Sequence, residues 1–113
     1  MNKVMIIGSL EREPEMRYTP SGKPVARFSI AARQSWVTTA GERRETTEWF
    51  NVVAWGALAE ICGQHLTKGR QIYVEGHLQT RALPGQDEQR NSRTELVATE
   101  MIMLDDASNG NAS

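Results

Sequence analysis

The sequence has one cysteine, no long hydrophobic run and almost no surplus of charge. Cys62 has no second cysteine to pair with, so a reducing, cytoplasmic environment is its simplest setting. No apolar run approaches the length that crosses a bilayer, and the first residues lack the layout of a signal peptide. We therefore expect a protein that is neither exported nor inserted in a membrane.

Neither sign of charge is in clear excess. The chain has 13 Lys and Arg against 14 Asp and Glu, a formal net charge of −1. Without Asp105 and Asp106, 12 acidic residues stand against the same 13 basic ones, which leaves residues 1–104 at +1. A polyanionic ligand would therefore depend on stacking and on grouped arginines such as Arg43 and Arg44 more than on bulk attraction.

The residue sets that carry catalysis or bind metals are missing as well. The sequence has no Gly-x-Ser-x-Gly elbow and no Gly-rich phosphate loop. Cys62 and His65 have the spacing of two metal ligands, but no second Cys or His pair completes a tetrahedral set. The apolar sequence around Cys62 indicates a core position on a helix instead. We expect no metal, no cofactor and no enzymatic activity.

Aromatic residues are few, yet three of the seven are tryptophans beside polar residues: Trp36, Trp49 and Trp55. Strand alternation over residues 47–56 predicts two different faces. The inward face would hold Phe50, Val52 and Ala54, and the outward face Trp49, Asn51, Val53 and Trp55. Two indoles beside an amide suit the stacking of nucleobases. Burial or a subunit contact is the ordinary role of a single tryptophan, but Trp36 belongs to a polar hairpin tip that offers little core.

Turn residues divide the chain into short strands and one helix. Strands are predicted over residues 3–10, 25–33, 49–55, 71–81 and 93–104. The second strand would point Ala26, Phe28, Ile30 and Ala32 inward. Thr39, Ala40 and Gly41 would form the turn between the second and third strands. The helix would begin at Gly56, have Leu58, Ile61, Cys62 and Leu66 at helical spacing, and end at Gly69 as a C-cap.

Five strands and a single helix favour a five-stranded Greek-key barrel of the OB type over residues 1–104. A parallel α/β sheet would need more helical crossovers than the chain offers. Residues 105–113 are expected to be disordered. In such barrels the face of strands 2 and 3, with the loops after strands 1 and 4, forms the ligand groove, and the tryptophans belong to that face.

The chain resembles the bacterial single-stranded DNA-binding protein family from Asn2 to about Leu104. The resemblance is carried by Asn-Lys-Val at 2–4, Arg-Tyr-Thr-Pro-Ser-Gly at 17–22, Thr-Glu-Trp at 47–49, Leu-Ala-Glu at 58–60, Leu-Thr-Lys-Gly at 66–69 and Tyr-Val-Glu-Gly-His-Leu-Gln-Thr-Arg at 73–81. It implies a nucleoid-associated protein that binds and protects single-stranded DNA in replication, recombination and repair. It also implies a homotetramer built as a dimer of dimers.

The resemblance assigns roles to particular residues. Base stacking would fall to Trp36, Trp49 and Trp55. Phosphate or groove contacts would come from Lys3, Arg17, Lys68 and Arg81. The strand and hairpin pattern adds Arg33, Arg43 and Arg44 to these contacts. Val4 and Ile6 would pair across a two-fold axis, and Gln71 and Tyr73 would lie between dimers.

The sequence departs from the family where Leu83 replaces a stacking tryptophan, and where Ala57 and Ala82 replace lysines. We expect weaker or more salt-sensitive binding as a result. The family's long linker and acidic tip have no counterpart in residues 105–113, so replication and repair proteins would be partners only with a longer tail. Two alternatives stay open: an OB-fold primosomal accessory protein, and a non-catalytic OB subunit of a nucleic-acid enzyme.

Overall fold

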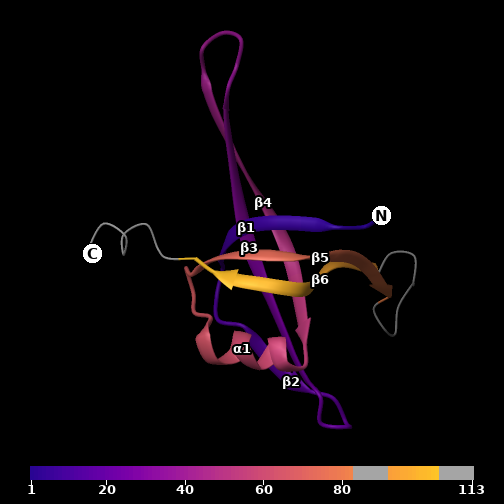
Figure 1. Cartoon of the computed structure of the whole chain (residues 1–113). Coiled ribbons are helices and arrows are strands. Elements are labelled where there is room, and N and C mark those ends of the chain that lie inside the picture. Colours follow the sequence, from indigo (N-terminus) through magenta and orange to yellow (C-terminus); the bar gives the residue numbers. More distant parts are fainter. Residues whose placement is uncertain (83–91, 105–113) are drawn as a thin grey trace.

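The structure is a computed structural model that describes residues 1–82 and 92–104 (Figure 1). Its elements are β1 (Val4–Leu10), β2 (Glu15–Tyr18), β3 (Pro24–Val37), β4 (Arg43–Trp55), α1 (Ala57–His65), β5 (Gln71–Ala82) and β6 (Ser92–Met103). The expectations for Leu83 and for residues 105–113 lie outside the described residues. No helix in the described part is long and apolar enough to span a membrane.

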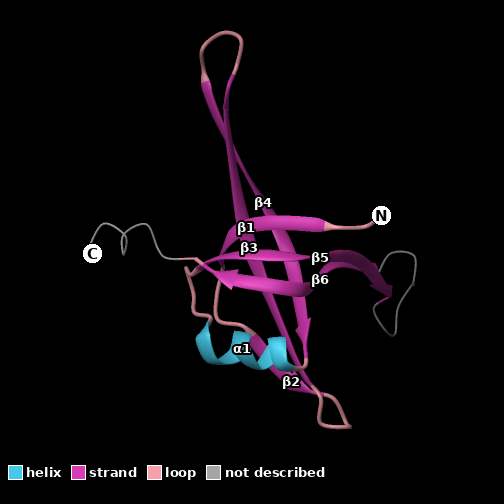
Figure 2. Ribbon diagram, viewed as in Figure 1, coloured by secondary structure: helices cyan, strands magenta, loops and turns pink. Residues whose placement is uncertain are grey.

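Five of the strands form a closed barrel in the order β1-β5-β6-β4-β3, and β3 pairs back to β1. All neighbours are antiparallel except β4 and β6, which run parallel at Val52 and Val53. The barrel closes where Ser9 pairs with Ala31, and a Cβ on the preceding Gly8 would stand 2.8 Å from the Ala31 carbonyl oxygen. This arrangement, with a helix after the third barrel strand (Figure 2), confirms the predicted OB fold.

The short strand β2 is absent from the sequence prediction, which places only a turn in this region. It pairs with the first residues of β3, from Glu15–Arg27 to Tyr18–Pro24, outside the closed barrel. Met16 and Tyr18 alternate with Glu15 and Arg17, but the run is only four residues long and only Met16 is half-buried, so the pattern is a weak strand signal. The strand exists because the edge of β3 is there to pair with.

The core is made by side chains from the barrel strands and from one narrow side of α1. Ala59, Cys62 and Leu66 are buried, at spacings of three and four residues that place them on one helical face. The prediction that Ile61 shares this face is wrong, since Ile61 is 41% exposed. Neighbouring residues of a helix point about 100° apart around its axis, so Ile61 points away from the side that Cys62 buries. The burial of Cys62, whose Sγ is 3.8 Å from the Sδ of Met101, agrees with a core role.

The ends of α1 differ from the prediction at one side only. The helix begins after Gly56, which has a φ of 67°, as expected. It ends at His65 with Leu66 as its C-cap, so the prediction of Gly69 as the cap is wrong. Gly69 instead occupies a separate turn, with a φ of 86° and its N–H donated to the carbonyl of Leu10.

The inward and outward faces of β3 and β4 largely follow the predicted alternation, but Phe50 is only half-buried and Val25, on the side of Trp55, is buried. Ala26, Phe28 and Ile30 are buried, but Ala32 is only half-buried because β3 leaves the barrel after Ala31. The outward residue Val53 is 2% exposed, against expectation. It lies in register between Arg27 of β3 and Val97 of β6, so neighbouring strands flank it on both sides.

Beyond the barrel, β3 and β4 continue as a two-stranded arm, which we define as residues 33–47 (Figure 1). Pairing is unbroken from Val25–Trp55 to Val37–Arg43, and the turn is closed by the Thr38 N–H donating to the Glu42 carbonyl at 2.8 Å. The arm raises the radius of gyration to 16.3 Å, where a compact chain of this length has about 13 Å. The helix α1 lies at the opposite end of the molecule from the arm.

Candidate nucleic-acid interface

Two tryptophans lie exposed on one face of β4. Trp49 is 57% and Trp55 is 40% exposed, and their strand partners on β3 are Ala31 and Val25. They are six residue steps apart along β4, which at the rise of a strand is about 20 Å. We call the outward surface of β3 and β4 between these two pairs the indole face. Sequence alternation predicts this placement of both rings, and the structure agrees.

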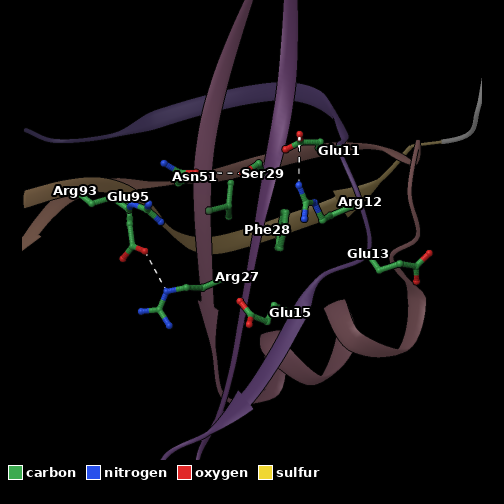
Figure 3. Close-up of a pocket in the computed structure, with 11 residues that line it drawn as sticks. Glu11, Arg12, Glu13, Glu15, Arg27, Phe28, Ser29, Asn51, Arg93 and Glu95 are labelled. Carbon is green, nitrogen blue, oxygen red and sulfur yellow. Dashed lines mark hydrogen bonds and ion pairs between the residues drawn. The ribbon is translucent and has the colours of Figure 1, made fainter. Parts of the chain in front are cut away.

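The centre of the indole face is polar and borders a cavity of about 210 Å³ (Figure 3). Ser29 Oγ donates to Asn51 Oδ1 at 3.1 Å across the strands. Arg27 Nε donates to Glu95 Oε2, also at 3.1 Å. Arg12 and Arg93 line the same cavity. None of these charged residues is among those predicted from the sequence to contact DNA. A carboxylate next to apolar residues of β6 is the sequence signal that Glu95 needs a partner.

Trp55 has a cation over its ring. The Nζ of Lys23 lies 5.4 Å from the ring centroid, within the range of a cation–π contact. Lys23 is fixed by the turn before β3, because its N–H donates to Thr19 Oγ1 at 3.0 Å. Lys23 is not among the residues predicted from the sequence, because the contact depends on the fold of this turn beside the Val25–Trp55 pair.

The arm places Trp36 on a different face from the other two tryptophans. Trp36 pairs with Arg44, five pairs along the ladder from Ala31–Trp49, and the register has no shift between them. Since successive residues alternate sides, an odd number of steps puts Trp36 and Arg44 on the opposite side of the ribbon. Trp36 is 46% exposed there. Arg33 and Arg43 share the side of Trp49, so both faces of the arm hold an exposed tryptophan or arginine.

The other basic residues predicted to contact phosphate are spread over the molecule. Arg17 pairs with Val25, in the row of Trp55, and its Nη2 is 2.7 Å from Glu15 Oε2. Arg44 Nη2 is 2.8 Å from Glu42 Oε1. Lys68 lies in the turn after α1, and Arg81 belongs to β5, where the structure describes only the backbone. Their roles at DNA stay predictions.

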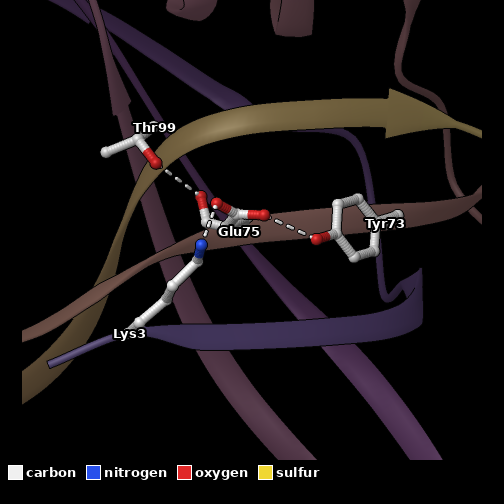
Figure 4. Close-up of polar contacts among 4 residues, drawn as sticks. All are labelled: Lys3, Tyr73, Glu75 and Thr99. Atoms are coloured by element: carbon white, nitrogen blue, oxygen red, sulfur yellow. Dashed lines mark hydrogen bonds and ion pairs between the residues drawn. The ribbon is translucent and has the colours of Figure 1, made fainter.

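Lys3 belongs to a polar network on the outer face of β1 and β5 (Figure 4). Its Nζ is 3.1 Å from Glu75 Oε2, and Tyr73 Oη donates to Glu75 Oε1 at 2.7 Å. These two bonds, that of Tyr73 first, lower the pKa of Glu75, and the bond to Glu75 raises the pKa of Tyr73. The network therefore links Lys3 to Tyr73, a residue predicted to lie between dimers. Lys3 thus lies on a different face from the indole face.

The same outer face carries an apolar row. Ile7 pairs with Tyr73 and Tyr73 with Ile102, and Ile7 and Ile102 are 53% and 48% exposed. Val4 and Ile6 alternate with Ile7 and pack half-buried against the core. Among the described residues, β1 pairs with β5 from Val4 to Ser9 but with β3 only at Ser9 and Leu10. The other edge of residues 4–8 therefore has free backbone groups.

Comparison with known proteins gives consistent matches. The model of the Single-strand binding protein family matches residues 1–104. Single-stranded DNA-binding protein 1 of Chlorobaculum tepidum is 47% identical over 105 residues, which is 92% of this chain and 65% of that protein. The single-stranded DNA-binding protein of Neisseria meningitidis is 45% identical over 104 residues, 92% of this chain and 60% of that protein. The chain thus spans less than two thirds of the length of these relatives.

Solved structures agree with these matches. A deletion mutant of the single-stranded DNA-binding protein from Thermus aquaticus superposes with a TM-score of 0.84 at 31% identity, over 96% of this chain and 52% of that one. The Plasmodium falciparum SSB in complex with ssDNA superposes with a TM-score of 0.82 at 31% identity, over 93% of this chain and 96% of that one.

Proposed function

The chain belongs to the single-strand binding protein family, and from that premise we propose that it binds single-stranded DNA with little sequence preference, without catalysis. The observation that supports this most directly is the indole face, where Trp49 and Trp55 are exposed on one side of β4. Exposed indoles are costly in water unless a flat ligand covers them, and every nucleobase has a face to stack.

In the proposed mechanism, bases stack on Trp49 and Trp55 along the barrel and on Trp36 along the arm. Each stacked base contributes about 1–3 kcal/mol. Phosphates are held by the predicted basic residues: Lys3, Arg17, Arg33, Arg43, Arg44, Lys68 and Arg81. Each such contact adds about 0.7 to the slope of log affinity against log salt. Protection of single strands in replication, recombination and repair, at the nucleoid of the cytoplasm, is part of the proposal.

We also propose that the chain assembles as a homotetramer. The free edge of β1 at Val4 and Ile6 suits pairing with a second copy across a two-fold axis. The outer face with Gln71, Tyr73 and the exposed Ile7 suits a second contact between dimers. Replication and repair proteins would bind such an assembly only through a longer tail.

Tryptophan fluorescence tests the proposed function. Titration with oligo-thymidine, at low and high salt, is expected to quench the emission to a defined nucleotide count, and duplex DNA is expected to leave it unchanged. Weak quenching by both would contradict stacking and favour the accessory-subunit alternatives.

Trp49→Ala is expected to weaken binding by about 1–3 kcal/mol with the fold retained, because it removes one stacking platform. Ile61→Ala is the matched control, since Ile61 is an exposed apolar residue on α1, away from the indole face. Equal affinity of the Trp49 variant and the wild type would remove Trp49 from the site.

A further inference from the structure

Glu95 is the one charged side chain that is buried among the described residues, with 5% of the residue exposed. It lies on β6 beside Leu96 and faces the cavity at the centre of the indole face (Figure 3). A buried carboxylate is costly unless it is paired, and near a polyanion it also repels the ligand. Its presence in a proposed DNA groove therefore needs a reason.

The pairing of Glu95 with Arg27 supplies that reason. The contact is made through Nε of the guanidinium, at 3.1 Å, by a side chain that is 29% exposed. A hydrogen bond through Nε does not use the two Nη groups, and it fixes the plane in which they lie. Glu95 thus holds Arg27 in one orientation with its terminal donors available to an acceptor.

Arg27 occupies a distinctive place on the indole face. It pairs with Val53, between the row of Trp55 and the row of Trp49. A strand stacked on both indoles has to span the roughly 20 Å between them, so its backbone must cross the row of Arg27. The outward residues of β3 and β4 along this interval are Arg27, Ser29, Asn51 and Val53, of which Arg27 alone is charged.

We propose that Arg27 contacts a backbone phosphate of single-stranded DNA between Trp49 and Trp55, two residues along the ladder from the row of Trp55, and that Glu95 is the positioning residue that holds it there. The inference rests on the proposed function and adds to it a contact that the sequence analysis does not contain. A guanidinium with two free amino groups matches the oxygens of a phosphate, whereas it offers no ring to continue the stack.

The direction in which Glu95→Gln changes the DNA affinity distinguishes a positioning role of Glu95 from a purely electrostatic one. If Glu95 acted only through its charge, Glu95→Gln would strengthen DNA binding. If it holds Arg27, the same change is expected to weaken binding by about 3- to 10-fold, because the Gln amide oxygen still accepts from Nε but holds the guanidinium less firmly than a carboxylate does. Glu11→Gln is the matched control, because Glu11 lines the same cavity but is exposed, and this variant is expected to bind no more weakly than the wild type.

The experiment measures the affinity for dye-labelled oligo-thymidine at several salt concentrations. Arg27→Met is expected to weaken binding and to reduce the salt slope by about 0.7, the value of one phosphate contact. The double variant Arg27→Met with Glu95→Gln is expected to bind like Arg27→Met alone, because the guanidinium that Glu95 positions is already absent. Circular dichroism and the unfolding temperature verify that each variant is folded.

Other results would overturn the inference. Unchanged or tighter binding by Glu95→Gln would end the positioning role, and an unchanged salt slope in Arg27→Met would end the phosphate contact. If Glu95→Gln does not fold, Glu95→Asp, which withdraws the carboxylate by one methylene, replaces it with the same expected loss. Failure of the wild type to bind would defeat the proposed function itself, whereas a normal wild type with unaffected Arg27 variants would defeat only this inference.

Discussion

At the scale of single residues, the ring of Trp55 is already occupied on one side. Lys23 lies 5.4 Å from its centroid, so a base that stacks there has to displace the ammonium or use the other side of the ring. An exposed cation–π contact contributes only about 0.5–1 kcal/mol, which is less than the roughly 1–3 kcal/mol of a stacked base, so the base can displace the ammonium. The displaced Lys23 would then be close to the phosphate of that base.

We therefore predict that Lys23→Met weakens the binding of oligo-thymidine by a few-fold and reduces the salt slope by about 0.7, the value of one phosphate contact. Affinity measured across a salt series checks both numbers. Tighter binding by the variant would mean that Lys23 only covers the ring of Trp55 and competes with the base.

Cys62 gives a second prediction at this scale, one about stability. Burial raises the pKa of its thiol from 9.0 to about 11. Between these values the unfolded chain loses the proton while the native chain keeps it, so the free energy of unfolding falls as pH rises, by up to about 1.4 kcal/mol per pH unit. Urea unfolding of the wild type and of Cys62→Ala over this range tests it. The variant should show the shallower decline, and equal slopes would contradict the prediction.

At the scale of elements, the arm is separate from the core. Its residues beyond Ala32 are exposed or half-buried, so the barrel does not depend on them for buried area. It carries Arg33, Trp36, Arg43 and Arg44, which are four of the residues predicted to contact DNA. We therefore expect the barrel to determine the stability of the fold, and the arm to contribute to DNA binding without stabilising the barrel.

We predict that joining Gln34 to Thr46 through an Asn-Gly turn leaves the unfolding temperature within a few degrees of the wild type. The contacts of Arg43 and of the ion-paired Arg44 are lost, so the salt slope should fall by between about 0.7 and about 1.4. Calorimetry and a salt series measure these effects, and Trp49 and Trp55 should still be quenched by DNA. Loss of folding would show that the arm stabilises the barrel.

The elements also show how far sequence reasoning reaches. Alternation and turn residues are local signals. Alternation predicts the barrel strands and the exposure of Trp49 and Trp55, and Gly56 predicts the start of the helix. Alternation misses β2, whose four residues pair only because β3 offers an edge. It also misses the contact between Arg27 and Glu95, which are 68 residues apart in the chain. The side of the ribbon on which Trp36 lies depends on unbroken pairing through the arm, which no single strand reveals.

At the scale of the whole molecule, the outer face of β1, β5 and β6 exposes an apolar row beside its polar network. The row of Ile7, Tyr73 and Ile102 stands beside Met5, which is 61% exposed. Contiguous apolar surface of this kind marks protein contacts. The proposed assembly would bury it.

Ile7→Lys is expected to reduce the molar mass measured by light scattering, because it places a charge in this row. The fold should persist, since Ile7 is 53% exposed in the single chain. Ile61→Lys is the matched control, with a side chain 41% exposed on α1, and it should keep the mass of the wild type. An unchanged mass in the Ile7 variant would place the subunit contact elsewhere.

The ion pairs at Lys3, Arg17 and Arg44 have a consequence for the whole binding reaction. Each of these cations already has a carboxylate within 3.1 Å, so the protein carries tethered counterions of its own. When a phosphate replaces a tethered carboxylate, the released carboxylate attracts a cation from solution, which offsets part of the cation release from the DNA. Of the two outcomes expected from the sequence, this favours weaker binding over more salt-sensitive binding. Affinity should decline with salt less steeply than the number of basic residues at the DNA would suggest.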